Sequence, residues 1–452
     1  MHRESWKSRV GFTFAALGSA VGLANICLFP YLVGKNGGAA FVAVYLICLV
    51  VVGFPVFISE ILLGRTAKSS PYGAFKKIGR KRFWLVIGKM TVLTGFMVTS
   101  FYSVLAGWVI GYLVEAIKGN LGNLNTADDS LKLFNSLTSM PWWGLFFHGV
   151  FMLMCVGIVY GGVRRGIERC SKLLMPALIF LLMLLVVRGL SLPHAWDGVR
   201  YLFSPDWSEL TPMAILLALG QAFFTLSLGQ GTMITYGSYL SDKDNIPGAC
   251  IPIALGDTVI SLCAAIVVFT TVFSVGMEPS QGGPGLLFQT LPLVFAKLPL
   301  SRLMAVLFFL FVALAAVTSE ISAMEPVVAY FVDEKKWKRS RAVILCGLGG
   351  FTLGIPSALS YGLLSSFTLF GMNFMDAVQF AVQSIMLPLG GFLAVILVGW
   401  VWGFDMAMKH LKQGGEHFFA RHPWFEPYIW FCIKYSAPIL IILVFINQFL
   451  KA

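Results

Sequence analysis

Hydroxyl, amide and glycine residues interrupt two apolar stretches of the sequence, at positions where hydrocarbon would offer their polar groups no partner. The stretch GSAVGLAN spans residues 18–25, and the stretch TLSLGQG spans residues 225–231. A break in an apolar helix frees backbone carbonyls and amides, and each costs several kcal/mol when it is left unpaired in lipid. A small cation can satisfy the carbonyls, whereas an anion can satisfy amides at the start of a helix. The two stretches therefore predict a site for a sodium ion bound together with a carboxylate.

A third apolar stretch, FVALAAVTSEISAMEP at residues 311–326, contains adjacent hydroxyls at Thr318 and Ser319. These hydroxyls could ligate a second cation, or they could donate back to carbonyls of the preceding helical turn. The residues alone leave both interpretations open. The same stretch holds Glu320 and Glu325, for which the sequence indicates no role.

Acidic residues within apolar segments are costly to bury, so each of them is a functional candidate. We expect Asp257, in the stretch ALGDTVIS, to coordinate sodium, and a protonated structural acid is the alternative. We expect Glu60 to have a structural role, in which it accepts hydrogen bonds from amides freed near a broken helix.

The elements that position these residues are predicted to be membrane spans. Of the 452 residues, 58% are hydrophobic and 12% are charged, which is not typical of a water-soluble enzyme. Uncharged stretches recur that reach the roughly 20 residues needed to cross a bilayer. We predict an all-α polytopic membrane protein with about eleven transmembrane helices. The predicted spans are 10–33, 38–63, 84–117, 141–163, 170–190, 211–240, 246–277, 301–332, 341–359, 375–404 and 426–450.

The net charge of +12 could indicate nucleic-acid binding, but the distribution of the charge argues against it. Most of the 33 Lys and Arg residues fall in segments that share one side of the membrane when the N-terminus is cytoplasmic. After eleven spans, the C-terminus is then extracellular. The lack of glycosylation sequons and of a cleavable signal favours the inner (plasma) membrane of a bacterium.

No linker divides the chain, so residues 1–452 are interpreted as a single transporter domain. The two interrupted spans are the first and the sixth, so the two halves of the chain enter the membrane in opposite orientations. Glycine-interrupted spans at matching positions predict an inverted repeat with its binding site at the breaks. The alternative is that Gly18 and Gly22 only allow close helix packing. The predicted repeats are residues 1–190 (spans 1 to 5) and residues 211–404 (spans 6 to 10), followed by residues 426–452 (span 11).

Six motifs occur in order along the chain: Arg3-x-x-Trp6, GSAVGLANICLFP, GKNGGAAF, GQAFFTLSLGQG, YGSYL and TSEIS. Together they closely resemble the neurotransmitter:sodium symporter family, and in particular its bacterial amino-acid transporters. The resemblance covers essentially the whole chain. It implies a 5+5 inverted repeat with broken helices 1 and 6, two sodium sites and no catalytic residue.

The resemblance implies which residues form these sites. The first implied sodium site uses the Ala20 carbonyl, the side chains of Asn25, Thr225 and Asp257, and the substrate carboxylate. The second uses the carbonyls of Gly18, Val21 and Ala315 and the hydroxyls of Thr318 and Ser319. The implied substrate contacts are Ser19, Ala20, Gly22, Leu23, Ala24, Val98, Tyr102, Phe224, Thr225, Ser227, Gln230, Ser319 and Ala323.

Within this implied site, the substrate carboxylate meets the amides near Leu23 and Ala24 and the hydroxyl of Tyr102. Phe224 and Tyr102 form the outer lid. Monoamine transporters of the family have an aspartate at the position of Gly22. Because glycine leaves room for a substrate carboxylate, the resemblance favours an amino acid as the substrate.

Chloride dependence is not expected. Animal members of the family bind chloride through five positions, and Tyr45, Gln221, Thr225 and Ser261 match four of them. The fifth position, usually asparagine, is Asp257 here. A fixed carboxylate already supplies the negative charge and would repel a second anion nearby.

The outer gate departs from the pattern of the family. The family usually pairs an arginine with an aspartate across the outer vestibule, and this chain has Leu28 and Gln379 at those positions. Losing both charges avoids leaving one of them unpaired, so we expect the outer gate to close by apolar packing. The implied inner gate matches the family and consists of Arg3, Trp6, Tyr239 and Asp333.

The predicted function is sodium-coupled symport of a neutral L-amino acid into the cell by alternating access. One alternative is a proton-coupled amino-acid transporter of the same fold, with Asp257 or Glu320 as the proton carrier. Another is a cationic or polar amino acid, or another small amine, as the substrate. An enzyme is not expected because the histidines are scattered and no Cys/His metal spacing occurs. The expected partners are the amino acid and the lipid bilayer but no nucleic acid, and the expected state is a monomer or a weak homo-oligomer.

Overall fold

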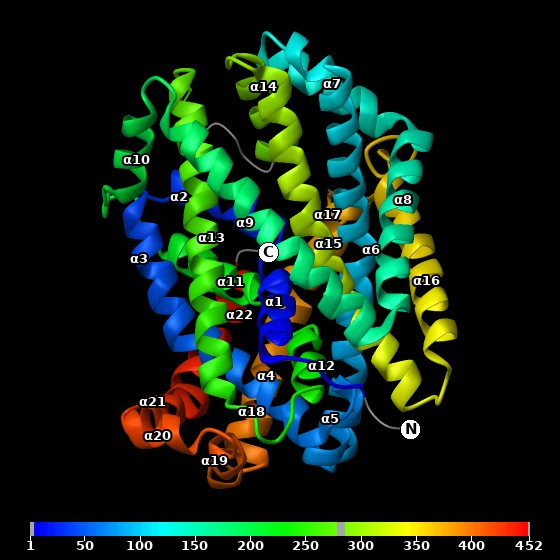
Figure 1. Cartoon of the computed structure of the whole chain (residues 1–452), viewed down its shortest axis with the longest axis vertical. Helices are drawn as coiled ribbons and strands as arrows, with labels where there is room; N and C mark the ends of the chain where they lie inside the picture. The colour runs from blue at the N-terminus through cyan, green and yellow to red at the C-terminus, as the bar shows by residue number, and fades with distance from the viewer. Residues whose placement is uncertain (1–3, 278–284, 451–452) are drawn as a thin grey trace.

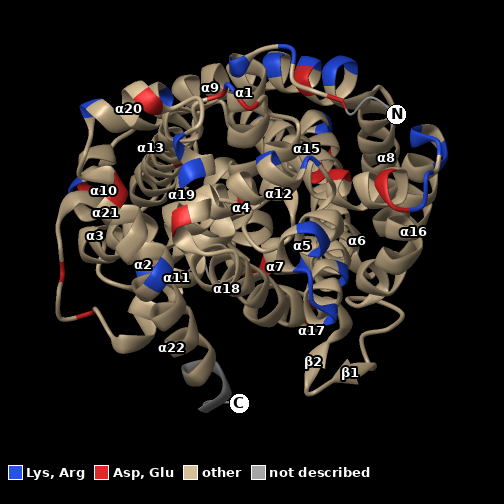
Figure 2. Ribbon diagram, turned by 90° about the horizontal axis from the view of Figure 1, so that it is seen from below, with Lys and Arg blue, Asp and Glu red and all other residues tan. Residues whose placement is uncertain are grey.

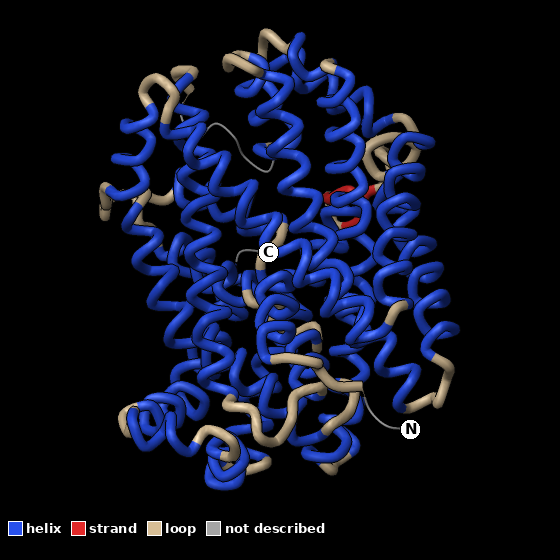
Figure 3. Tube along the Cα trace, in the orientation of Figure 1, coloured by secondary structure: helices blue, strands red, loops and turns tan. Residues whose placement is uncertain are grey.

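Helices form almost the whole molecule (Figure 1). The computed structural model describes residues 4–277 and 285–450. In this part of the chain, the strands form one short antiparallel hairpin, in which β1 (Thr368–Leu369) pairs with β2 (Met372–Asn373). Figure 3 shows how small this hairpin is beside the helices that surround it.

The helices of the first half run from the N-terminal segment to the loop before the sixth predicted span. They are α1 (Arg9–Ala20), η1 (Ala24–Leu28), α2 (Phe29–Lys35), α3 (Ala39–Cys48), η2 (Leu49–Gly53), α4 (Phe54–Ala67), α5 (Pro71–Gly79), α6 (Arg82–Lys118), η3 (Asn120–Asn123), α7 (Ala127–Ser139), α8 (Pro141–Tyr160), η4 (Val163–Glu168), α9 (Arg169–Leu190) and α10 (Ala195–Phe203).

The helices of the second half complete the bundle. They are α11 (Pro212–Thr225), α12 (Thr232–Ser238), α13 (Ile246–Ser274), η6 (Leu286–Thr290), α14 (Leu291–Ala296), α15 (Ser301–Asp333), α16 (Arg339–Leu359), α17 (Phe374–Phe380), η7 (Ala381–Met386), α18 (Leu387–Ile396), η8 (Leu397–Val401), α19 (Phe404–Lys412), α20 (Glu416–Arg421), α21 (Phe425–Phe431), η9 (Cys432–Ser436) and α22 (Ala437–Leu450).

The membrane spans lie where the sequence predicts them. Within the described residues, nine helices are long and apolar enough to cross a bilayer, and the bent pair Arg9–Ala20 and Ala24–Lys35 makes a tenth. The shorter helices α11 and α12 occupy the predicted sixth span. The arrangement of the two halves as inverted repeats stays a prediction.

Both predicted breaks are present. The helix axis turns by 53° between α1 and η1, and six residues without helical structure separate α11 from α12. In the second break, Gly229 has a φ of +82°, and a Cβ atom there would lie 2.0 Å from the Leu387 carbonyl oxygen. Only glycine fits this position, because it tolerates the left-handed backbone and the close approach of α18.

Basic residues gather at one end of the bundle. Helices α5 and α19 lie at the same end as the N-terminal segment (Figure 1), and each carries two lysines in its last turn. Figure 2 views the molecule from this end, and its Lys and Arg residues are visible there. Such grouping is typical of the cytoplasmic face of a membrane protein. Which side of the membrane this end faces stays a prediction.

Candidate functional site

The two breaks meet in the interior of the bundle. The Ser227 hydroxyl donates to the Ser19 carbonyl at 2.8 Å, and the Ser19 hydroxyl donates to the Ser227 oxygen at 3.1 Å. The hydroxyls of Ser19 and Ser322 are 2.7 Å apart, which adds α15 to the same network. The breaks of the first and sixth spans therefore share their hydrogen bonds with the eighth.

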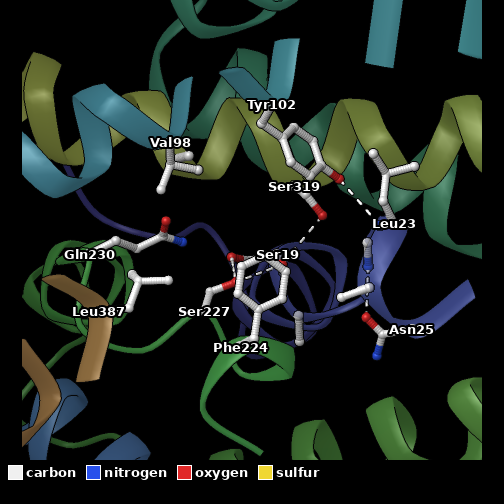
Figure 4. A pocket seen from close by; sticks show the side chains of 14 residues that line it. Ser19, Leu23, Asn25, Val98, Tyr102, Phe224, Ser227, Gln230, Ser319 and Leu387 are labelled. Carbon is white, nitrogen blue, oxygen red and sulfur yellow. Dashed lines mark hydrogen bonds between the residues drawn. The ribbon is translucent and has the colours of Figure 1, made fainter. Parts of the chain in front are cut away.

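A cavity lies beside these breaks (Figure 4). It contains almost all of the predicted substrate contacts. Its lining residues are Ser19, Ala20, Gly22, Leu23, Ala24, Asn25, Val98, Tyr102, Phe224, Ser227, Gln230, Ser319, Ala323 and Leu387.

Three residues differ from the predicted list of substrate contacts, and one of them, Asn25, lines the cavity although it was predicted only as a sodium ligand. Thr225 does not line it, because its hydroxyl is turned toward Asp257, to which it donates at 2.6 Å. Leu387 lines the cavity although it was not predicted. An apolar residue in an apolar span gives no signal in the sequence, and only the contact between α18 and the second break reveals it.

A buried polar cluster lies next to the cavity. The Asn25 amide nitrogen lies 2.7 Å from an Asp257 carboxylate oxygen, 2.8 Å from the Thr225 hydroxyl and 2.9 Å from the Ser261 hydroxyl, and its two N–H groups are shared among these three acceptors. The Asn25 oxygen accepts from the Gly22 N–H at 3.1 Å. All three side chains predicted for the first sodium site are thus in one place. The amide nitrogen of Asn25, rather than its oxygen, faces the carboxylate.

A second group of oxygen atoms joins α15 to the break after α1. The Ser319 hydroxyl donates to the Val21 carbonyl at 3.0 Å and to the Gly18 carbonyl at 3.3 Å. The Thr318 hydroxyl donates to the Ala315 carbonyl at 3.0 Å, which is the back-bonding alternative that the sequence left open. These contacts bring Ser319 together with two of the carbonyls predicted for the second sodium site, whereas Thr318 bonds to the third, Ala315, within its own helix.

Gly22 lies against two hydroxyls at one end of the cavity. A Cβ atom there would lie 2.8 Å from the Ser319 hydroxyl and 3.1 Å from the Tyr102 hydroxyl. The Tyr102 oxygen accepts from the Leu23 N–H at 3.4 Å. A backbone N–H and two hydroxyls therefore lie close together at this end, and such donors can bind an anion.

Glu60 has the predicted structural role. Its carboxylate accepts a hydrogen bond from the Gly229 N–H at 2.7 Å, so it satisfies an amide freed by the second break. The structure also shows hydrogen-bond donors to Glu325, for which the sequence indicated no role. Glu325 accepts two hydrogen bonds from the Arg339 guanidinium, at 2.6 Å and 2.8 Å, and one from the Tyr239 hydroxyl at 2.7 Å.

A wider cavity lies next to this one, on the side that is predicted to face outward. Leu23, Ala24, Tyr102 and Phe224 line both cavities, so they form the partition between them, as predicted for the lid. Leu28 and Gln379 line the outer cavity as well. That they close the outer gate by packing stays a prediction.

The residues predicted for the inner gate lie at another part of the bundle and make polar contacts there. The Trp6 indole N–H donates to the Tyr236 carbonyl at 3.0 Å, and the Trp6 backbone N–H donates to the Tyr239 carbonyl at 3.3 Å. Asp333 accepts from the Ser70 N–H at 2.6 Å. The predicted partner of Asp333, Arg3, lies outside the described residues.

Comparison with known proteins agrees with this geometry. A family model described as the sodium:neurotransmitter symporter family matches residues 3–131 and 129–452. The chain belongs to this family. The symporter is therefore a sodium-dependent membrane transporter, and it is not an enzyme.

Relatives of this symporter cover nearly its whole length. It is 39% identical over 446 residues to the uncharacterized sodium-dependent transporter YhdH of Bacillus subtilis, with 98% of this chain and 97% of YhdH covered. It is 27% identical to the human sodium- and chloride-dependent creatine transporter 1, with 90% and 72% covered.

A solved structure shows the same fold. The symporter is similar to the crystal structure of MhsT in complex with L-phenylalanine, with a TM-score of 0.89 and 41% identity. The match covers 98% of this chain and 99% of the MhsT chain.

Proposed function

We propose that this symporter couples sodium to the uptake of a neutral L-amino acid by alternating access. The observation that supports this is the cavity end at Gly22, where the Leu23 N–H and the hydroxyls of Tyr102 and Ser319 lie close together. We propose that the substrate carboxylate binds at this end. The relative MhsT, which is similar over nearly the whole chain, was crystallised with L-phenylalanine.

The lining of the cavity favours a neutral substrate. No Asp, Glu, Lys or Arg is among its lining residues, and Glu320 is not part of it. A cationic or acidic side chain would lose its hydration without gaining a counter-charge, which is unfavourable. This argues against the alternative of a cationic amino acid.

Two sodium ions are proposed to move with the substrate. The first would lie among Asn25, Thr225, Asp257, the Ala20 carbonyl and the substrate carboxylate, because these supply the hard oxygen ligands that sodium requires. Using the Asn25 oxygen requires the amide to turn away from its present bond with Gly22. Contact between the ion and the carboxylate would make their affinities reciprocally dependent.

The second ion would lie among the Gly18, Val21 and Ala315 carbonyls and the hydroxyls of Thr318 and Ser319. The hydrogen bonds that these hydroxyls now donate occupy the oxygens that an ion would take. An ion here would tie α15 to the first break, and its loss to the cytoplasm would release that contact. We expect this step to begin substrate release.

Chloride is not expected to take part. Asp257 lies fully buried beside Asn25 and Thr225, where a carboxylate replaces the charge of an anion. The proposed location is the inner membrane of a bacterium, with the N-terminus in the cytoplasm and the C-terminus outside. No partner other than substrate, ions and lipid is required, and a monomer would be sufficient.

The test is binding of radiolabelled L-amino acids to the purified chain, in sodium or in choline at the same pH. We expect one or more neutral amino acids to bind in sodium only, and Asn25→Ala to abolish this binding. Ala15→Gly, at a buried position of α1 outside the cavity lining, serves as the matched control and should retain it. Equal binding in sodium and choline would contradict the proposal and favour proton coupling.

A further inference from the structure

Gln230 occupies the end of the cavity that is opposite to the proposed carboxylate position. In Figure 4 its side chain lies far from Leu23 and Asn25, at the other side of Ser19 and Ser227. A substrate whose carboxylate lies near Leu23 would therefore extend its side chain toward Gln230. The tip of that side chain is the part that Gln230 can contact.

The backbone around Gln230 is fixed by its neighbours. The Gly229 N–H donates to Glu60 at 2.7 Å, and the Cα of Gly229 packs against the Leu387 carbonyl. On the other side, a Cβ at Gly231 would lie 2.6 Å from Pro71. The break is held between α4, α5 and α18, so Gln230 has a defined position before any substrate binds.

The carboxamide of Gln230 has no hydrogen bond to any of the described residues, although the residue is only 6% exposed. The other side chains at this end of the cavity, Val98 and Leu387, are apolar (Figure 4). The carboxamide faces the cavity, where water can hydrate it, but a purely apolar group bound against it would exclude that water and leave the amide unpaired, which is costly. An amide that faces an otherwise apolar cavity end can instead select a ligand that completes its hydrogen bonds.

We propose that Gln230 determines specificity by hydrogen-bonding to a polar atom at the tip of the substrate side chain. The substrate class is then a neutral L-amino acid with an apolar stem and a hydrogen-bonding tip, such as a phenol hydroxyl, an indole N–H or a carboxamide. This inference rests on the proposed function, since it takes the carboxylate end of the cavity as given. A site built to hydrogen-bond a substrate discriminates strongly against the analogue that lacks the polar group.

The experiment compares pairs of amino acids that differ mainly in the polar tip. Competition binding in sodium to the purified full-length chain would compare L-tyrosine with L-phenylalanine, and L-glutamine with L-methionine. We expect the polar member of at least one pair to bind about tenfold or more tightly, the value of one good hydrogen bond. In Gln230→Met, that preference should vanish or reverse.

Two controls keep the outcome decisive. The thermal unfolding temperature of purified Gln230→Met, compared with that of the unaltered chain, reports whether the variant is folded. Ala15→Gly, at a buried position outside the cavity lining, should retain the preference. If Gln230→Met does not fold, Gln230→Asn, which withdraws the amide by one methylene, replaces it and should weaken the preference.

Different binding results would overturn the role of Gln230 and the proposed function. Sodium-dependent binding in which the apolar member of both pairs binds as tightly as the polar one would overturn the role of Gln230 alone. A preference that persists unchanged in folded Gln230→Met would do the same. If no neutral amino acid binds in a sodium-dependent way, the proposed function itself is overturned, and the role of Gln230 with it.

Discussion

Ser227 and Ser19 exchange hydrogen bonds across the two helix breaks, with the Ser227 hydroxyl 2.8 Å from the Ser19 carbonyl. Ser227 also has a φ of +53°, in the left-handed region that a serine rarely adopts. Such backbone strain persists only where surrounding contacts impose it. The two breaks are therefore held in one arrangement, and the cavity beside them depends on this pair.

Removing the Ser227 hydroxyl should weaken substrate binding without abolishing it. In Ser227→Ala the Ser19 carbonyl loses the nearer of its two donors and keeps only the Ser319 hydroxyl at 3.4 Å, and we expect sodium-dependent substrate affinity to fall by about tenfold, the effect of one lost buried hydrogen bond. Equilibrium binding of the labelled substrate measures this change.

Ser227→Gly distinguishes the effect of the lost hydroxyl from the effect of backbone strain. Like alanine, glycine removes the hydroxyl, but it also tolerates the positive φ at this position. We expect it to lose affinity as Ser227→Ala does but to be the more stable of the two in thermal unfolding. Unchanged affinity in both variants would show that the Ser227–Ser19 pair does not shape the site.

Replacing the Asp257 carboxylate should create a need for chloride. In Asp257→Asn the negative charge beside Asn25 and Thr225 is gone, whereas Gln221 keeps an amide that has no hydrogen-bond partner among the described residues. We expect uptake by this variant to be weaker and to stop when chloride is replaced by gluconate. Uptake by the unaltered chain should be the same in both salts.

The Ser261 hydroxyl lies in the same cluster, 2.9 Å from the Asn25 amide nitrogen, and offers a control. Adding Ser261→Ala to Asp257→Asn should weaken the effect of chloride, because a donor to the anion is lost. Chloride dependence in the unaltered chain would refute the assignment of Asp257 as the fixed charge.

The ion pair between Arg339 and Glu325 should matter for stability. Glu325 is fully buried, and the guanidinium bonds to both of its oxygens. Arg339→Gln would leave a buried carboxylate without its counter-charge, which costs on the order of 3–5 kcal/mol. We expect a clearly lower thermal unfolding temperature for the purified variant.

The double variant Arg339→Gln with Glu325→Gln removes both charges and should recover much of the lost stability. This follows because breaking a buried pair is more costly than replacing it. A double variant as unstable as Arg339→Gln alone would mean that the carboxylate was not the cause.

The positions of the membrane spans and of the two helix breaks could be predicted from the sequence, and the reason is physical. Clustered glycines and hydroxyls weaken an apolar helix and free its backbone groups, so the breaks at 18–25 and 225–231 could be located without coordinates. The carboxyl of Glu60 could be assigned to a freed amide by the same reasoning.

Contacts between residues that are distant in the sequence and belong to no recognisable motif could not be predicted. Leu387 is one apolar residue among many, and its place in the cavity follows from the approach of α18 to Gly229. Arg339 begins a helix after a basic loop, so nothing in the sequence singled it out as the partner of Glu325. The direction of the Asn25 amide likewise depends on which neighbours it meets in three dimensions.

Glu320 offers a direct test between sodium and proton coupling. It is fully buried, it lies next to Ser319 in the chain, and no ion pair joins it to a cation in the described part of the structure. Glu320→Gln keeps the shape of the side chain but can neither carry a negative charge nor exchange a proton. If sodium alone drives uptake, this variant should accumulate substrate as the unaltered chain does under an imposed sodium gradient.

The matched measurement imposes a proton gradient, inside alkaline, with sodium absent. We expect no accumulation in proteoliposomes that contain either protein. Accumulation by the unaltered chain that disappears in Glu320→Gln would identify Glu320 as a proton carrier and overturn sodium as the sole driving ion. Glu320→Leu would not serve, because it changes the packing as well as the charge, so a loss of uptake could follow from either change.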